Sequence, residues 1–286
     1  MSDEREVSAA DHHSSLITHH SSRLRRLFKR LRAEKRCGFI AYVTCGDPDC
    51  ATTAAVVENL EQAGVDAVEL GIPFSDPIAD GPVIQAASHR ALQRGTTVND
   101  VFSIARAIRK RSEIPLIAFS YINPVIRYSA ERFAADAEAS GIDGMLLTDL
   151  PPEAASEVRN ALRAHRISGV FLLAPTSTDE RIKAVNRVSD DFIYYVSTTG
   201  VTGARKELDP ALLARLDEIR GKVTKPLAVG FGISEHAHFE ALRERCDAVV
   251  VGSAIVRAIA DGDTARAPER AAAVVRRILD KQPAAS

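Results

Sequence analysis

Short apolar runs alternate with amphipathic segments along most of the chain. Each run spans four to six residues and precedes a segment whose apolar residues recur at helical spacing. Runs that are apolar on both faces are typical of parallel strands covered by helices. The predicted strands are Phe39–Thr44, Asp66–Leu70, Pro115–Phe119, Ile142–Leu147, Gly169–Leu173, Phe192–Val196, Pro226–Val229 and Ala248–Val251.

Helices are predicted between and after these strands. Eight strand–helix units in about 250 residues match an α/β fold of the (β/α)8 TIM barrel type. An open doubly wound sheet is the competing fold, but no Gly-x-Gly-x-x-Gly follows the first strand, where a dinucleotide-binding fold needs it. Because no linker interrupts the pattern, we expect residues 23–286 to form a single barrel domain. The predicted helices are Thr52–Ala63, Pro82–Gln93, Val98–Lys110, Ala130–Ala139, Pro152–His165, Thr178–Val188, Pro210–Ile219, Glu235–Arg245 and a segment from Ser253 onward.

A basic helix and a polar tail precede the barrel. Residues 23–36 carry eight basic side chains, one acid and an apolar stripe, which together predict an extra N-terminal helix. We expect the stripe to dock on the barrel, although a basic amphipathic helix can also bind a membrane or a partner. Residues 1–22 hold four histidines with no cysteine or carboxylate at ligand spacing, which favours a disordered tail over a metal site. The stripe consists of Leu24, Leu27, Phe28 and Leu31.

The composition excludes several classes of function. Apolar residues make up 45% and charged residues 26% of the 286 residues, and a net charge of −1 gives no general attraction to nucleic acid or membranes. Aromatic residues reach only 5% and tryptophan is absent, which argues against a base-stacking surface. No apolar run is long enough to span a membrane, and the polar N-terminus does not resemble a secretory signal. With four cysteines and no Cys-x-x-Cys pair, we expect reduced thiols in a cytoplasmic protein.

Glu69 is the strongest candidate for chemistry. It is the only carboxylate near the carboxyl end of any predicted strand, and the active sites of such barrels lie at that end. If the strand face that it shares with Ala67 points inward, burial raises the pKa of Glu69 toward neutrality, which suits a general acid/base. The alternative is a structural ion pair, but no predicted strand ends in a basic residue.

The segments that follow other strand ends offer further candidates. Residues 72–82 contain three prolines together with Asp76 and Asp80, so this loop could present a second carboxylate or could simply form a turn and a helix cap. The glycines and serines at 230–234 and 252–253 suit a phosphate site, because glycine lets backbone N–H groups approach an anion; tight turns are the alternative. Residues 197–203 are predicted to form a lid over the substrate or a plain connection.

Four motifs together resemble the tryptophan synthase α subunit family. They are LGIPFSDPIADGPVIQ, YVSTTGVTG, VGFGIS and VGSAIV, and the resemblance extends from about Arg23 to the helix near Lys281. It implies retro-aldol cleavage of a phosphorylated small molecule, indole-3-glycerol phosphate, to indole and glyceraldehyde 3-phosphate in tryptophan biosynthesis. It also implies a β subunit that carries pyridoxal phosphate as the partner in an α2β2 tetramer, with no cofactor or metal on this chain.

The resemblance also assigns roles to individual residues. It implies that Glu69 is the acid/base, that Asp80 interacts with the indole N–H, and that Tyr194 lies close to the acid/base. Phe119 stands where the family often has an aliphatic residue. The implied phosphate contacts are Gly203, Gly232, Gly252 and Ser253, and the residues implied to line or close the pocket are Phe39, Tyr121, Leu173, Thr202 and Phe231.

Two other functions compete with a carbon–carbon lyase. Another phosphate-binding barrel, an indole-glycerol-phosphate synthase or a ribulose-phosphate epimerase, would need a lysine or histidines at its strand ends, and the predicted strands end in neither. A catalytically idle partner subunit would have no need of Glu69 and Asp80. The residues therefore favour the lyase.

Overall fold

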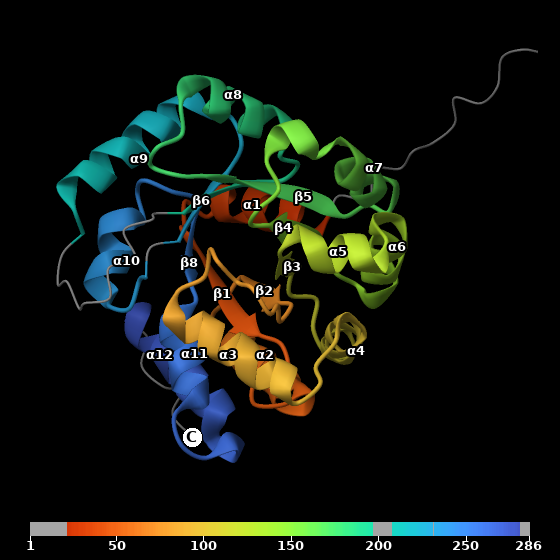
Figure 1. Ribbon diagram of the computed structural model, residues 1–286. Helices are drawn as coiled ribbons and strands as arrows, with labels where there is room; N and C mark the ends of the chain where they lie inside the picture. The colour runs from red at the N-terminus through yellow and green to blue at the C-terminus, as the bar shows by residue number, and fades with distance from the viewer. Residues whose placement is uncertain (1–21, 197–207, 231, 281–286) are drawn as a thin grey trace, which may run out of the picture.

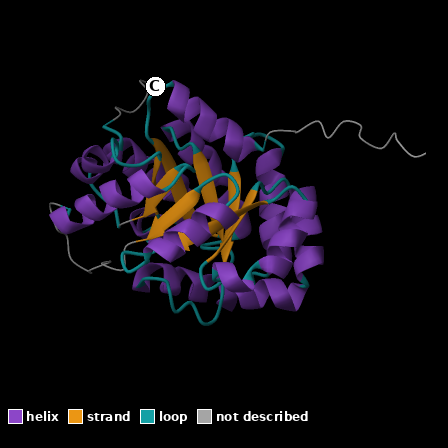
Figure 2. Ribbon diagram, turned by 90° about the horizontal axis from the view of Figure 1, so that it is seen from above, coloured by secondary structure: helices purple, strands orange, loops and turns teal. Residues whose placement is uncertain are grey.

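The computed structural model describes residues 22–196, 208–230 and 232–280. Eight parallel strands in this part of the chain follow one another in sequence order and close into a barrel, with the first strand paired to the last (Figure 1). Helices surround the strands (Figure 2), so the predicted (β/α)8 fold is confirmed. The strands are β1 (Gly38–Thr44), β2 (Ala67–Gly71), β3 (Leu116–Ser120), β4 (Gly144–Leu147), β5 (Ser168–Leu173), β6 (Ile193–Val196), β7 (Leu227–Gly230) and β8 (Ala248–Val251).

The helices follow the predicted order with three differences. The sequence predicts no helix at Ile122–Tyr128, because seven residues with an internal proline carry little periodicity. The segment predicted as Pro152–His165 is a short 3₁₀ turn followed by a helix, and the final segment is divided near Gly262, whose φ of 78° is incompatible with a continuing helix. The α-helices are α1 (Arg23–Ala33), α2 (Cys50–Ala63), α3 (Pro82–Gln93), α4 (Val98–Arg109), α5 (Ile122–Tyr128), α6 (Ala130–Ser140), α7 (Ser156–Ala164), α8 (Asp179–Val188), α9 (Pro210–Lys222), α10 (His236–Leu242), α11 (Ser253–Ala260) and α12 (Ala267–Ile278).

Alternate strand residues divide the buried side chains into two sets. One set fills the inside of the barrel, and the other packs between the strands and the surrounding helices. Among the described residues no helix is both long and apolar enough to cross a membrane. All four cysteines are free. The inner set includes Ile40, Ala67, Ile117, Leu146, Val170, Phe192, Tyr194, Ala228, Ala248 and Val250.

The extra helix α1 packs against the inner set, as the stripe predicts. Leu24, Leu27, Phe28 and Leu31 are all buried with the inner side chains. The ring of Phe28 lies 5.1 Å from that of Phe192, just before β6. Burying such side chains stabilises the fold by about 1.5–3 kcal/mol each, so α1 is an integral part of the core.

An aspartate near the start of each even-numbered strand forms a hydrogen bond with the odd-numbered strand before it. Each carboxylate accepts a hydrogen bond from the backbone N–H at the start of its odd-numbered neighbour. These N–H groups lie at strand starts, so the contacts lie at the amino ends of the strands. The pairs are Asp66 with Phe39, Asp143 with Leu116, Asp190 with Gly169 and Asp247 with Leu227, at 2.8–2.9 Å.

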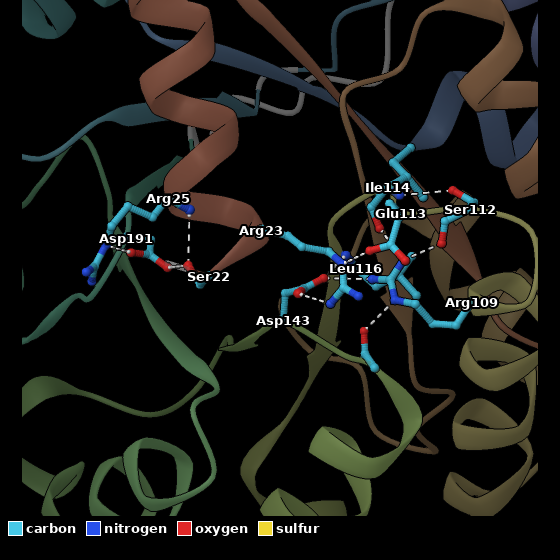
Figure 3. Close-up of polar contacts among 11 residues, drawn as sticks. Ser22, Arg23, Arg25, Arg109, Ser112, Glu113, Ile114, Leu116, Asp143 and Asp191 are labelled. Carbon is cyan, nitrogen blue, oxygen red and sulfur yellow. Dashed lines mark hydrogen bonds and ion pairs between the residues drawn. The ribbon is translucent and has the colours of Figure 1, made fainter. Parts of the chain in front are cut away.

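Arginines neutralise these four aspartates and the neighbouring Asp191. A buried carboxylate is costly unless it is paired, and α1 supplies Arg23, Arg25 and Arg30 for this purpose. Its basic side chains therefore hold the helix to the barrel at several points around the base, and Figure 3 shows two of them. The ion pairs are Arg30 and Arg36 with Asp66, Arg23 and Arg109 with Asp143, Arg163 with Asp190, Arg25 with Asp191, and Arg220 with Asp247.

We expect Asp66→Ala to lower the free energy of unfolding by about 1–3 kcal/mol, because it leaves the buried N–H of Phe39 without an acceptor and removes the partner of Arg36. Chemical denaturation at pH 7 measures this loss. The control is Glu240→Ala, which breaks only exposed ion pairs, with Arg243 and His236, and should change stability by no more than about 1 kcal/mol. Equal losses in the two variants would contradict the structural role of Asp66.

Candidate active site

Glu69 lies inside the barrel near the carboxyl end of β2. It pairs in register with Tyr42 on β1 and Ile117 on β3, and only 1% of its surface is exposed. Among the described residues, neither carboxyl oxygen has a hydrogen-bond partner and no cation forms an ion pair with it. Burial raises the pKa of Glu69 to about 8. The carboxyl group is therefore mostly protonated at neutral pH and can donate a proton.

Two buried tyrosines lie close to this carboxyl group. A side chain on Gly71 would meet the hydroxyl of Tyr42 at 2.2 Å, and one on Gly230 would meet the hydroxyl of Tyr194 at 2.5 Å, so both glycines make room for phenols. Burial, together with the nearby negative charge of Glu69 and Asp80, raises the pKa of both phenols well above 10. Both hydroxyl groups therefore remain hydrogen-bond donors.

Asp80 lies in the loop of residues 72–81, between β2 and α3, and is half-buried. Burial raises the pKa of its carboxyl group to about 6, against the opposing effect of a hydrogen bond from Tyr121. Gly81 is the N-cap residue of α3 and no side chain caps this helix, so the alternative of a capping role for Asp80 is wrong. The other loop carboxylate, Asp76, is exposed.

The two carboxyl groups have different charge states at neutral pH. Glu69 has no partner and is mostly neutral, whereas Asp80 retains a hydrogen bond and is mostly ionised. Both raise the pKa of Tyr194, so both face the same region of the barrel mouth. A proton donor and a fixed negative charge in one apolar site is an arrangement suited to acid–base chemistry.

The loops that follow β7 and β8 contain the described part of the predicted phosphate site. Gly232 has φ +59°, a conformation that favours glycine, and a Cβ built on it meets nothing within 4 Å. Gly252 is the N-cap residue of α11, and Ser253 is the first residue of that helix. None of the described side chains caps α11, so its first N–H groups can be satisfied by an anion.

The other predicted pocket residues lie in different parts of the structure or outside the described residues. The side chains of Phe39 and Leu173 are fully buried and belong to the outer set, between strands and helices, so the structure does not bring them to the inside of the barrel. Tyr121 follows β3 and contacts the Asp80 loop. Thr202, Gly203 and Phe231, and the rest of the predicted lid at 197–203, lie outside the described residues.

Sequence reasoning overlooks two polar side chains in this part of the barrel. Tyr42 lies beside Glu69, and its ring meets that of Phe119 edge-on at 5.1 Å. Asp149, two residues beyond β4, is a further carboxylate at a strand end and accepts the N–H of Ile122. Every residue of β1 is buried, so its apolar pattern does not reveal which face is inward. A polar hydroxyl at Tyr42 is the one signal that could have identified it.

Two carboxyl groups of different pKa at the mouth of a (β/α)8 barrel are an arrangement typical of barrel enzymes that use acid–base chemistry. The sequence pattern of the family described as "Tryptophan synthase alpha chain" matches residues 28–283. The chain belongs to this family, which confirms both the resemblance and the predicted class of enzyme, a lyase.

Relatives and solved structures agree with this assignment. The tryptophan synthase alpha chain of Solibacter usitatus is 51% identical over 83% of this chain and 89% of its own length, and that of Geotalea daltonii is 45% identical over 82% and 89%. The tryptophan synthase subunit alpha of Legionella pneumophila superposes with a TM-score of 0.84 at 33% identity, covering 91% and 97% of the two chains. A chain from the tryptophan synthase α2β2 complex of Pyrococcus furiosus gives 0.81 at 38%, covering 85% and 98%.

The burial of Glu69 predicts a pH-dependent cost to stability. Between about pH 4.5 and pH 8 the folded state keeps the Glu69 proton and the unfolded state releases it, so stability falls as pH rises. Glu69→Gln removes this ionisation. We expect the variant to gain stability relative to wild type by up to about 1.4 kcal/mol per pH unit across this window.

Denaturant unfolding of both proteins at several pH values between 5 and 8 measures the difference. A difference that stays constant over this range would show that Glu69 has an ordinary pKa in the folded chain.

Proposed function

We propose that this chain cleaves indole-3-glycerol phosphate to indole and glyceraldehyde 3-phosphate, with Glu69 as general acid and base and Asp80 as the group that binds the indole N–H. The observation that carries the proposal is the buried Glu69 carboxyl group, which has no partner within the described residues. Family membership supports the choice of substrate. It also argues against another phosphate-binding barrel.

The reaction requires two proton transfers in sequence. The protonated Glu69 carboxyl delivers a proton to C3 of the indole, which places positive charge on the ring. The Asp80 carboxylate accepts the indole N–H and stabilises that charge. The bond between C3 and the glycerol side chain then breaks, and the electron pair of this bond restores the neutral indole. The side chain loses a hydroxyl proton to the Glu69 carboxylate and becomes an aldehyde, so Glu69 regains its starting state.

The different environments of the two carboxyl groups support these roles. A pKa of about 8 for Glu69 keeps the proton available at neutral pH, and a pKa of about 6 leaves Asp80 charged. General acid–base catalysis is most efficient when the pKa of the group lies near the working pH. The reaction consists of proton transfers and one bond cleavage, so we propose that this chain holds no cofactor of its own.

The phosphate of the substrate would be held at the loops after β7 and β8. Gly232, Gly252 and Ser253 offer backbone N–H groups there, and the N-terminus of α11 adds positive potential. We propose that Gly203 adds a further N–H. Tyr194 and Tyr42 would border the other end of the substrate beside Glu69.

The proposed partner is a tryptophan synthase β subunit that carries pyridoxal phosphate and receives the indole in an α2β2 tetramer. The support is family membership together with the solved α2β2 complex of Pyrococcus furiosus. Ile78 in the Asp80 loop and Ile126 on α5 are large apolar side chains that are 85% and 61% exposed, and a partner at the barrel mouth would cover them. We place the chain in the cytoplasm, where its free thiols stay reduced.

Glu69→Gln should lower kcat for indole release by at least about 10²–10⁴-fold, because the amide keeps the shape but cannot transfer the proton. Steady-state release of indole from indole-3-glycerol phosphate, with and without a β subunit, measures this. Glu157→Gln, an exposed residue on α7, is the control and should retain wild-type activity. An active, folded Glu69→Gln protein would exclude the proposed role. A wild-type chain inactive under both conditions would instead be an idle partner subunit.

Gly252→Ala should weaken the binding of glycerol phosphate by about tenfold or more, because the new methyl group hinders the approach of an anion to the N–H groups of α11. The methyl group meets Tyr42 and Ile84 at ordinary contact distances of 3.4–3.5 Å, so the fold should persist. Calorimetric titration provides the measurement. Gly221→Ala on α9 meets nothing within 4 Å and is the matched control. Unchanged affinity in Gly252→Ala would place the phosphate elsewhere.

A further inference from the structure

Tyr121 contacts the catalytic loop of residues 72–81 at both ends. Its hydroxyl accepts a hydrogen bond from the backbone N–H of Ala79 at 2.9 Å. Its ring lies 5.1 Å from that of Phe74, near the start of the loop. The side chain of Tyr121 is 3% exposed, so these contacts are shielded from water. One side chain thus spans the loop that carries Asp80.

The same hydroxyl group interacts with the carboxyl group of Asp80. This hydrogen bond lowers the pKa of Asp80 and opposes the effect of burial. Burial and the Asp80 charge raise the pKa of the Tyr121 phenol to about 12, so the phenol keeps its proton and donates it to the carboxylate. The hydroxyl oxygen accepts from Ala79 while its proton points to Asp80, which uses both of its hydrogen-bonding capacities.

The end of β4 holds Tyr121 in place. The N–H of Thr148 donates to the carbonyl oxygen of Ser120 at 3.0 Å, and the Asp149 carboxylate accepts the N–H of Ile122 at 2.8 Å. The residues on both sides of Tyr121 are therefore fixed. The Thr148 hydroxyl also donates to the carbonyl oxygen of Ser120, at 3.3 Å. Because Tyr121 is anchored to the barrel, it can position the loop.

We propose that the Tyr121 hydroxyl is a positioning group, which holds the loop of residues 72–81 so that the Asp80 carboxylate faces the indole N–H. This role belongs to the hydroxyl and is separate from any contact between the tyrosine ring and the substrate. The inference rests on the proposed function of Asp80. It adds that the charge and place of this carboxylate depend on a residue from a different βα unit.

The test is Tyr121→Phe, which keeps the ring and its packing on Phe74 but removes both hydrogen bonds of the hydroxyl. We expect kcat for indole release to fall about 10–100-fold with little change in KM, because the ring and the phosphate contacts remain. Loss of a hydrogen bond to the ionised form raises the pKa of Asp80. The acidic limb of the kcat/KM profile should therefore move to higher pH, on the order of one unit.

A direct titration complements the kinetics. In protein labelled with ¹³C at aspartate carboxyl carbons, the Asp80 resonance, assigned with Asp80→Asn, should titrate at higher pH in Tyr121→Phe than in wild type. This measurement needs no turnover, so it keeps its meaning if the substrate proves to be different. Thr148→Val, which removes the hydrogen bond from the Thr148 hydroxyl to the Ser120 carbonyl beside Tyr121, should shift both readouts in the same direction by a smaller amount. It is the second variant if Tyr121→Phe does not fold.

Tyr128→Phe is the matched control. Tyr128 lies on α5, seven residues along the chain from Tyr121, and its hydroxyl bonds to Asn99 and Asp136, outside the barrel mouth. It should leave kcat, KM and the pH profile unchanged.

The outcomes separate the two proposals. A wild-type chain that releases no indole, alone or with a β subunit, contradicts the proposed function. An active wild type, with wild-type kcat and an unmoved Asp80 titration in Tyr121→Phe, overturns the positioning role alone. A higher KM in that variant, with kcat and the acidic limb unchanged, also overturns it, since the hydroxyl would then only bind substrate.

Discussion

The structure must accommodate a carboxyl group that lies inside an apolar barrel without a hydrogen-bond partner. Each unsatisfied buried polar group costs about 1–3 kcal/mol, and neither oxygen of Glu69 has a partner among the described residues. The fold must supply the compensating stability away from the site. It does so with a closed ring of eight strands and with α1, whose four apolar side chains are buried against the inner core. The free-energy cost of the unpaired carboxyl group, near the carboxyl ends of the strands, is thus offset by packing elsewhere in the barrel.

The carboxylates at the base show what Glu69 lacks. Asp66 is also buried, yet it binds two arginines and a backbone N–H. Asp80 lies between these extremes, half-buried with a single tyrosine hydroxyl as partner. The same functional group is therefore structural, charged or proton-donating according to the number of its partners. These differences between the three carboxyl groups follow from hydrogen bonding and burial alone.

The sequence predicts the barrel well, because strand and helix periods differ and repeat eight times. It also predicts the inward position of Glu69, since an acid in an otherwise apolar strand stands out. It fails where both faces of a strand are apolar. Phe39 and Leu173 are expected in the pocket, but their strands place them on the outer face, and Tyr42 occupies the inner position beside Glu69. Only the register between neighbouring strands decides this. The hydrogen bonds of the base aspartates and of Tyr121 on the Asp80 loop join residues that are 20–42 positions apart, which no local pattern reports.

The aspartates at the base recur with a period of two strands. Each one lies in the second strand–helix unit of a pair and reaches back to the first, so that β1–β2, β3–β4, β5–β6 and β7–β8 each contain one such contact. The barrel therefore divides into four sectors with the same internal fastening, the pattern expected of a fold assembled by duplication of a (βα)2 unit. A circular permutation with its new chain ends between two sectors leaves every fastening within one continuous segment, whereas an opening inside a sector separates an aspartate from the strand that it holds.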